Sequence, residues 1–284
     1  MFIKNSSHIY SNTLSSHLNL STIQPIYFAI PNSLFSQSIK TIYFSNLNRL
    51  IMAVSKRIAV VTGASGNLGK AVVKKFIDEG YFVIGTRHKT VTAFSSFPEN
   101  KFESIEVDLA NEEAAEAFVD NVIAKHNRID VAILTAGGFA MGNIAETKTS
   151  DIARQYKLNF ETAYNIARPV FTHMLQQNNG RIFITGSRPG LDMRNSKGMV
   201  AYGLSKSLIF RMAELMNEEA KGKNVVTNVI VPGTIDTPQN RESMPNGHFD
   251  KWTTPESIAD VIYWYSSNES AVLREGILKV YNSA

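Results

Sequence analysis

Apolar positions along residues 57–284 follow two alternating patterns. Short runs rich in β-branched residues predict strands buried on both faces, and longer segments with apolar residues every three to four positions predict helices. The predicted strands are 57–61, 81–86, 102–107, 130–135, 180–187, 225–231 and 276–281. The predicted helices are 70–79, 110–125, 151–177, 199–220 and 255–266. This regular alternation predicts an α/β fold: a single doubly wound parallel sheet of about seven strands, with helices on both faces.

Residues 1–52 lie outside this alternation and differ from the rest in composition. They are rich in serine and asparagine, contain no acidic residue and are interrupted by Pro25 and Pro31. Such a segment is typical of a targeting peptide or an unstructured extension, so we expect a leader at 1–52 and a folded domain at 53–284. As a targeting peptide it fits a plastid better than a mitochondrion. The sequence fits equally well with translation that starts at Met52, and in that case we expect a cytoplasmic protein.

The charge of the chain is concentrated in this leader. Lys4, Lys40 and Arg49 give it +3, which leaves +1 of the total +4 for the remaining residues. A nearly neutral body without basic runs argues against nucleic-acid binding, and no apolar run approaches the ~18 residues that a membrane-spanning helix needs. The chain has no cysteine, which excludes disulfides and thiol nucleophiles. The histidines are scattered without ligand spacing, so we also expect no metal site.

Residues 62–69, Thr-Gly-Ala-Ser-Gly-Asn-Leu-Gly, join the first predicted strand to the first predicted helix. Glycines in such a turn let the backbone approach a pyrophosphate, and the helix N-terminus offers unpaired N–H groups and a positive dipole end. Strand, glycine turn and helix together predict a Rossmann-type dinucleotide site, although an ordinary glycine-rich turn is the alternative. The candidate cofactor contacts in this turn are Gly63, Ser65, Gly66, Asn67, Leu68 and Gly69.

The ends of the other strands carry residues that suit the rest of a dinucleotide. Arg87 ends the second strand, where a basic residue favours the 2′-phosphate of NADP and an acidic one would favour NAD. Asp108 ends the third strand, where its carboxylate could accept a hydrogen bond from the adenine amino group. We therefore expect NADP(H), with NAD(H) as the alternative. The further candidate contacts are Arg87, Asp108, Leu109, Ala136, Gly137, Gly138, Tyr202, Lys206, Pro232, Gly233, Thr234, Ile235 and Thr237.

Tyr202 and Lys206 form a Tyr-x-x-x-Lys pair in the predicted helix 199–220. Residues four apart share one face of a helix, so the lysine is expected to stabilise the phenolate and lower the pKa of Tyr202. Ser187 ends the fifth strand at the same edge of the sheet, and Asn159 lies within the predicted helix 151–177. Such Tyr-x-x-x-Lys pairs also occur by chance on solvated helix faces. Here the candidate residues all follow strands that end at the same edge of the sheet, which favours a catalytic site.

These ordered motifs resemble the short-chain dehydrogenase/reductase family over roughly residues 55–284. The resemblance implies an NAD(P)-binding Rossmann domain and a small-molecule substrate. It implies that Tyr202 is the proton donor to a carbonyl, and that Lys206 binds the nicotinamide ribose. It further implies that Ser187 hydrogen-bonds the substrate oxygen and that Asn159 positions a water in a proton relay. Hydride would pass from the nicotinamide to a carbonyl or imine carbon.

Within the family, the chain is similar to the dihydropteridine reductases. The Gly-x-x-Gly-x-x-Gly spacing, the sequence Ala136-Gly137-Gly138-Phe139 and the segments 234–245 and 249–253 carry this likeness. Two features depart from the animal enzymes of that branch: Arg87 stands where they have an acidic residue, and Ser187 is present where they lack the serine. The pteridine substrate is therefore one alternative beside another carbonyl compound.

Two further expectations concern partners and class. A catalytically silent NADP-binding redox sensor is the non-enzyme alternative, although this chain keeps all four catalytic residue types.

Apolar residues spread over a wide arc of the helices 151–177 and 199–220, and the family commonly pairs these helices between subunits, so we expect a homodimer or homotetramer. The loops 139–143, 188–199 and 238–252 are expected to border the substrate.

Overall fold

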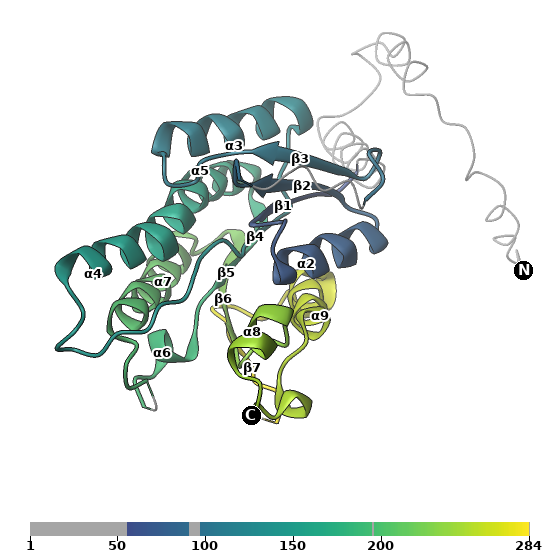
Figure 1. Cartoon of the computed structure of the whole chain (residues 1–284). Helices are drawn as coiled ribbons and strands as arrows, with labels where there is room; N and C mark the ends of the chain where they lie inside the picture. Colours follow the sequence, from purple (N-terminus) through teal and green to yellow (C-terminus); the bar gives the residue numbers. More distant parts are fainter. Residues whose placement is uncertain (1–55, 91–96, 195, 284) are drawn as a thin grey trace, which may run out of the picture. The chain divides into compact units, whose positions relative to one another are not determined.

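The computed structural model describes residues 56–90, 97–194 and 196–283. The predicted leader at 1–52 lies outside the described residues. Within them, the strands form one parallel sheet in the order β3-β2-β1-β4-β5-β6-β7 (Figure 1). The strands are β1 (Ile58–Thr62), β2 (Phe82–Arg87), β3 (Phe102–Glu106), β4 (Val131–Leu134), β5 (Asn179–Thr185), β6 (Asn224–Pro232) and β7 (Ile277–Val280). The predicted α/β class and doubly wound parallel sheet are confirmed.

The longer helices also follow the predicted order. They are α2 (Asn67–Asp78), α3 (Glu112–His126), α4 (Thr149–Tyr156), α5 (Thr162–Gln177), α7 (Val200–Glu219) and α9 (Pro255–Ser266). The predicted start of the first helix at residue 70 was wrong, because the glycine turn itself forms the first turn of α2. The helix expected over 151–177 is present, but it is not a regular α-helix throughout. A π-helical turn, η3 (Lys157–Glu161), separates α4 from α5.

Short elements in the loops were not predicted. They are α6 (Arg188–Leu191), α8 (Pro238–Ser243) and the 3-10 turns η4 (Phe249–Lys251) and η5 (Asn268–Ser270). Both short helices begin with a hydroxyl cap and a proline: Ser187 accepts from Gly190 N and Thr237 from Asn240 N. Pro238 is the first residue of α8 and Pro189 the second of α6, and a proline in the first turn together with a side-chain cap favours the start of a helix.

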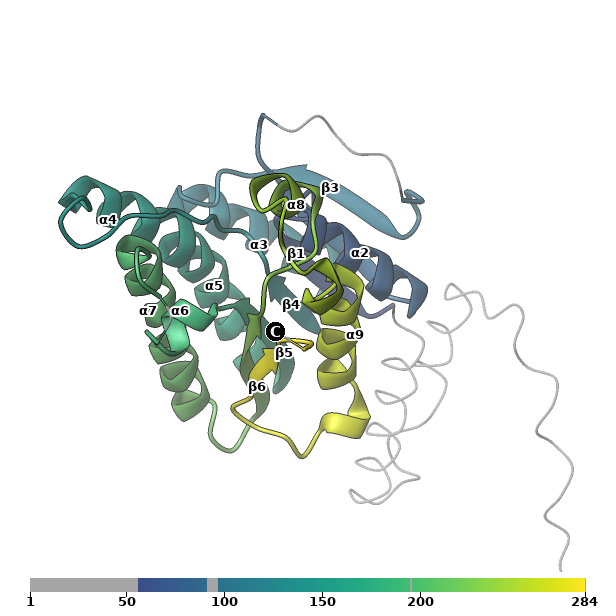
Figure 2. The ribbon, with the colours of Figure 1, turned by 60° about the horizontal axis from the view of Figure 1, so that its bottom comes forward.

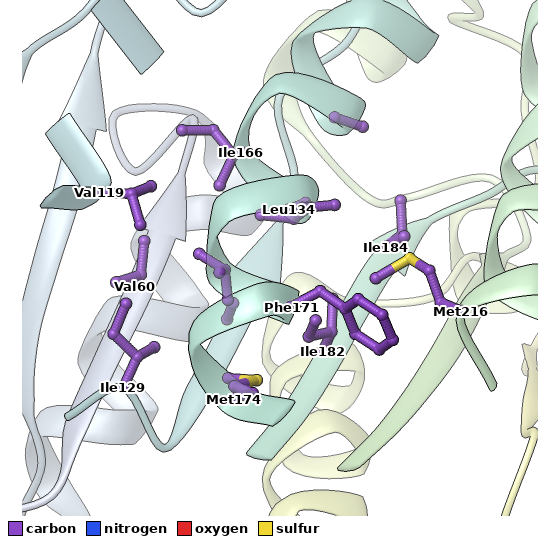
Figure 3. Close-up of a cluster of buried hydrophobic side chains, with 14 of the residues drawn as sticks. Val60, Val119, Ile129, Leu134, Ile166, Phe171, Met174, Ile182, Ile184 and Met216 are labelled. Carbon is purple, nitrogen blue, oxygen red and sulfur yellow. The ribbon is translucent and has the colours of Figure 1, made fainter. Parts of the chain in front are cut away.

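The sheet lies between its helices (Figures 1 and 2), and two clusters of buried apolar side chains hold the layers together. Side chains alternate along a strand, so Val60 points toward one cluster and Val61 toward the other. The first cluster joins the sheet to α3, α5 and α7 through Val119, Ile166 and Met216 (Figure 3). The second joins it to α2 and α9, for example through Phe76. Both faces of the central strands β1 and β4 are covered, which explains why these strands read as continuous apolar runs, whereas the edge strands β3 and β7 are partly exposed.

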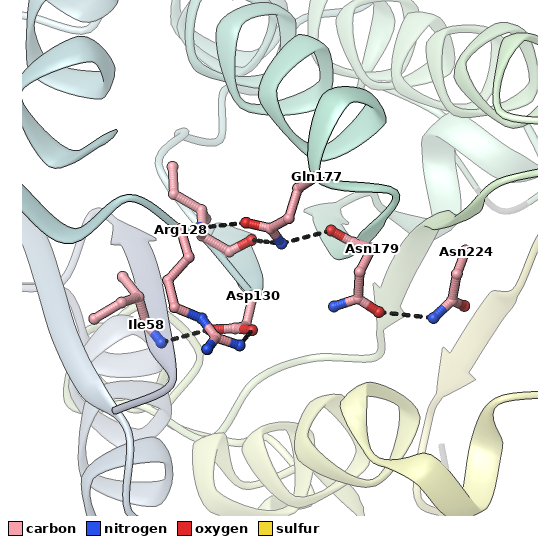
Figure 4. Close-up of polar contacts among 7 residues, drawn as sticks. Ile58, Arg128, Asp130, Gln177, Asn179 and Asn224 are labelled. Atoms are coloured by element: carbon pink, nitrogen blue, oxygen red, sulfur yellow. Dashed lines mark hydrogen bonds and ion pairs between the residues drawn. The ribbon is translucent and has the colours of Figure 1, made fainter. Parts of the chain in front are cut away.

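A polar network ties together the N-terminal ends of the strands (Figure 4). The carboxylate of Asp130 accepts from Ile58 N at 2.7 Å and from Arg128 Nε at 2.9 Å. The amide of Gln177 bonds to both backbone groups of Ile129 and donates to Asn179 O at 2.7 Å. These bonds fasten one edge of the sheet, opposite the edge where the candidate site residues lie. No helix in the described part of the chain is long and apolar enough to cross a membrane.

Candidate active site

The glycine turn after β1 is compact, and it leaves the N-terminal N–H groups of α2 without a side-chain cap. Gly63 adopts a left-handed conformation (φ 63°), and its carbonyl accepts from Gly66 N at 2.9 Å. A Cβ on Gly69 would lie 2.1 Å from Gly63 O, so only glycine lets α2 approach the turn this closely. Gly66 caps α2 without a side chain. The N–H groups of the first helical turn are therefore available to an anion such as a pyrophosphate.

Asn159 is 1% exposed and its side chain is bonded to the backbone beyond β4. Its Oδ1 accepts from Gly138 N at 2.9 Å and its Nδ2 donates to Gly138 O at 3.0 Å. Nδ2 also lies 2.9 Å from Gln155 Oε1 and 3.2 Å from Ser205 Oγ. A Cβ on Gly137 would come within 2.6 Å of Asn159 Oδ1, so only glycine fits there without a shift of Asn159. The π-helical segment thus directs the Asn159 side chain inward, where it holds the loop that follows β4.

Tyr202, Ser187 and Lys206 meet at the C-terminal end of β5. Ser187 is 5% exposed; its hydroxyl accepts from Gly190 N at 3.1 Å and lies close enough to the Tyr202 hydroxyl to influence its pKa. The ammonium of Lys206, 4% exposed, donates to Thr185 O at 2.6 Å. These contacts bring together three predicted catalytic side chains from two separate segments.

The electrostatics of this group differ from the expectation. Burial raises the pKa of the Tyr202 hydroxyl above its usual value, and the nearby Ser187 side chain opposes this rise. The predicted lowering of the Tyr202 pKa by Lys206 was therefore wrong in direction, because burial has the largest effect. Burial also lowers the pKa of Lys206 to about 8. At neutral pH the phenol holds its proton and the lysine its charge.

The buried ammonium of Lys206 has unused hydrogen-bonding capacity. A lysine has three N–H donors, and in the described part of the chain the one acceptor bonded to Lys206 is Thr185 O. Burying a charge with so few partners is costly unless a ligand completes the set. Together with the open end of α2, this fits a dinucleotide whose ribose hydroxyls reach the lysine.

The second-strand residue Arg87 already has an acidic neighbour. Its Nη1 lies 2.8 Å from Glu106 Oε2, because the parallel register places the two residues side by side on β2 and β3. Asp108, at the same edge, is exposed and accepts from Ala110 N at 3.1 Å. The sequence pattern alone did not reveal Glu106, which became a neighbour only through strand pairing.

The segment after β6 folds over the same edge. Gly233 N donates to Val280 O at 2.9 Å, and Ile235 forms a parallel bridge with Thr253. Asn67 in the glycine turn donates to Gln239 Oε1 on α8 at 2.6 Å. The candidate cofactor contacts in the segment 232–237 therefore lie at the same end of the sheet as the glycine turn.

Sequence reasoning missed the polar residues that support the site: Gln155, Ser205, Gln239, Glu106 and Thr185. Of these, Gln155 left a usable signal, because a polar residue four positions before Asn159 shares its helix face. Among the residues that the structure describes, no three histidines, aspartates or glutamates gather as a metal-binding group.

Known proteins resemble this chain in sequence and in fold. The family model described as short chain dehydrogenase matches residues 57–247. The 3-oxoacyl-[acyl-carrier-protein] reductase FabG of Thermotoga maritima is 26% identical over 246 residues, covering 81% of this chain and 98% of that protein. The dihydropteridine reductase of Dictyostelium discoideum is 27% identical over 228 residues, covering 79% and 94%.

A solved structure, ElxO with NADP bound, superposes with a TM-score of 0.72 at 22% identity and covers 79% of this chain and 97% of that one. This likeness supports the fold. Since the family model spans most of the chain, the protein belongs to the short chain dehydrogenase family and is an oxidoreductase.

Proposed function

We propose that this protein is an NADP(H)-dependent reductase of a small carbonyl or imine compound, with Tyr202 as the general acid. The observation that carries the proposal is the convergence of Ser187, Tyr202 and the buried Lys206 at the C-terminal end of β5. A phenol whose pKa is raised by burial stays protonated at neutral pH, which suits proton donation in the reductive direction.

Each residue then has a defined task. The nicotinamide, when bound, supplies the hydride. Tyr202 donates its hydroxyl proton to the substrate oxygen or nitrogen, and Ser187 donates a hydrogen bond to the same atom or to the phenolate. Lys206 holds a ribose hydroxyl and stabilises the negative charge on Tyr202. Because the side chain of Asn159 is bonded to Gly138, any water that it positions would be held through its backbone carbonyl.

The cofactor would lie along the C-terminal edge of the sheet. The pyrophosphate would lie against the first turn of α2, the adenine near Asp108, and the nicotinamide near the loop 136–138 and the segment 232–237. Arg87 is proposed to contact the 2′-phosphate.

We expect Arg87→Gln to lower kcat/KM for NADPH by roughly 10–100-fold and to change kcat/KM for NADH much less. A charge-assisted hydrogen bond to phosphate is worth about 1.5–3 kcal/mol. Glutamine is preferred to aspartate because a carboxylate at 87 would face Glu106. Steady-state kinetics with both cofactors measure the ratio, and Lys74→Gln, an exposed cation on α2, is the control. An unchanged ratio would remove Arg87 from cofactor selection.

A quinonoid dihydropteridine is the second candidate substrate. The relative from Dictyostelium and the resemblance of the segments 234–245 and 249–253 favour it. The two candidates and the silent-sensor alternative are separated by one screen. Purified protein is mixed with NADPH and with a panel of ketones, aldehydes and quinonoid dihydropterin, and absorbance at the NADPH band is followed. Turnover with any of them supports the enzyme; NADPH binding without any oxidation would favour the sensor.

We also propose that the protein forms a homodimer or homotetramer. Exposed apolar side chains lie on α4, η3, α5 and α7, which are neighbouring elements: Ile152, Tyr156, Leu158, Tyr164, Leu204, Leu208 and Leu215. A contiguous apolar face on packed helices suits a second copy of the same chain. Light scattering coupled to size-exclusion chromatography measures the mass, and a monomer at micromolar concentration would contradict the proposal.

A further inference from the structure

A cavity of about 730 Å³ lies between α6 with the residues that follow it and the end of β7. Its volume lies in the range of small-molecule sites, but it is open to solvent on one side, and Arg188 and Lys279 on its wall are exposed. Its lining residues are Arg188, Leu191, Asp192, Met193, Arg194, Lys279 and Tyr281.

The lining is unusually rich in cations. It contains three basic side chains and one carboxylate. Asp192 forms an ion pair with Arg194, which lowers the pKa of that carboxyl to about 2. At pH 7 both groups are therefore ionised, and their opposite charges cancel. Arg188 and Lys279 remain as two positive charges that this carboxylate does not neutralise. The excess is local, because the chain beyond residue 52 carries only +1.

Arg188 stands apart from the other arginines. Most of them bond to a carboxylate or a backbone carbonyl, as in Arg128 with Asp130 and Arg181 with Asn224 O. Across 56–90, 97–194 and 196–283, Arg188 is the one arginine whose guanidinium has no hydrogen-bond or ion-pair partner. It lies instead over the ring of Tyr281, 4.5 Å from the ring centroid. Stacking holds the guanidinium plane while leaving its N–H donors available, which suits a carboxylate or phosphate.

The cavity adjoins the candidate catalytic group. Arg188 directly follows Ser187 in the chain, and both belong to the start of α6. Met193, another lining residue, packs against the turn of α7 that carries Tyr202: a Cβ on Gly203 would lie 3.3 Å from Met193 Sδ. A molecule whose reacting carbon lies at Tyr202 could therefore extend a second group toward Arg188.

We propose that this cavity binds an anionic group of the substrate, a carboxylate or a phosphate, with Arg188 as its anchor and Lys279 as a second cation. The inference rests on the proposed reductase function and specifies its substrate class: a carbonyl or imine compound that carries a negative charge away from the reacting carbon. Arg188 and Lys279 act in binding, and neither takes part in the transfer of hydride or proton.

The test compares matched substrates that differ only in charge. The preferred ketone of the screen is prepared with a terminal carboxylate or phosphate, and each is paired with its neutral ester or alcohol. We expect kcat/KM to favour the anionic member, mainly through KM. Arg188→Gln should reduce that preference by roughly 10–100-fold and Arg188→Lys by less, since lysine keeps the charge but loses the planar pair of donors. Lys279→Gln should produce a smaller loss.

Lys223→Gln is the control, because it removes one exposed charge beside β6 at the opposite edge of the sheet. It should leave the preference unchanged. The preference should also weaken as salt is raised. Equal kcat/KM for the anionic and neutral partners, or a preference that survives Arg188→Gln, would overturn the proposal while leaving the reductase function intact.

A binding measurement separates this proposal from the proposed function. Isothermal titration with inorganic phosphate uses the wild-type protein and the Arg188→Gln and Lys223→Gln variants, each saturated with NADP⁺ so that the cofactor's own phosphate sites are filled. Weak binding that is lost only in Arg188→Gln supports the anion site even if no compound is reduced. Absence of phosphate binding, or binding that Arg188→Gln retains, counts against the site. Phosphate binding at Arg188 without any anionic preference in turnover would overturn the assignment of the site to the substrate.

Discussion

Tyr202→Phe is expected to lower kcat for NADPH-dependent reduction by about 10²–10⁴-fold, the usual contribution of a positioned general acid. The substitution removes only the hydroxyl group, which lies near Ser187. The aromatic ring, whose centroid lies 5.0 Å from that of Phe139, keeps its edge-to-face contact. The fold and the cofactor site should therefore be preserved, and the loss should be in the chemical step.

Three measurements together test this prediction. Steady-state kinetics give kcat, quenching of protein fluorescence gives the Kd for NADPH, and thermal unfolding gives Tm. We expect kcat alone to change substantially. Tyr164→Phe, which removes the hydroxyl of a tyrosine 43% exposed on α5, is the matched control and should retain activity. Wild-type turnover in Tyr202→Phe would remove Tyr202 from the mechanism.

Lys206→Met is expected to abolish most activity and, at neutral pH, to make the protein more stable. The ammonium is 4% exposed and its pKa is lowered from 10.5 to about 8 by burial. A shift of this size corresponds to roughly 3 kcal/mol of cost for burying the charge. Methionine fills similar space without a charge. Loss of the charge beside Tyr202 should lower kcat/KM by about 10²-fold or more.

The stability difference should depend on pH in a defined direction. Below pH 8 the lysine is charged in both the folded and the unfolded states, so the wild type carries the full cost. Between about 8 and 10.5 the folded protein releases the proton while the unfolded chain still holds it. Stability of the wild type relative to Lys206→Met therefore rises over this interval, because the unfolded state binds more protons.

Urea unfolding at pH 6, 7, 8, 9 and 10, in the absence of NADP(H), measures this difference for the two proteins. We expect the variant to have the higher midpoint at pH 6–7, and the gap to shrink above pH 8. Arg211→Met, which removes an exposed cation of α7, provides a comparison without a buried charge. A constant gap at every pH would show that the charge of Lys206 is not the cause.

The order of elements and the edge that carries the site were determined by the sequence alone. Apolar runs without polar interruption, such as 58–61, mark strands covered on both faces, and helices between them require parallel pairing. Parallel strands all end at one edge, so residues that follow strands, such as Gly63, Ala136 and Ser187, had to lie at that edge. The glycine spacing in 63–69 was equally local, because it depends on the backbone of one turn.

The electrostatics of the site were decided only by the tertiary structure. The pKa of Tyr202 rises rather than falls because its surroundings, not its helix neighbour, dominate. Arg87 faces Glu106 because β2 and β3 pair in one particular register, which no local pattern specifies. Asn159 turns inward because a π-helical turn interrupts a helix whose periodicity looked continuous. Arg188 lies over Tyr281, although 93 positions separate them in the chain. Burial, register and contacts between distant residues are properties of the folded chain, and they determine what these side chains can do.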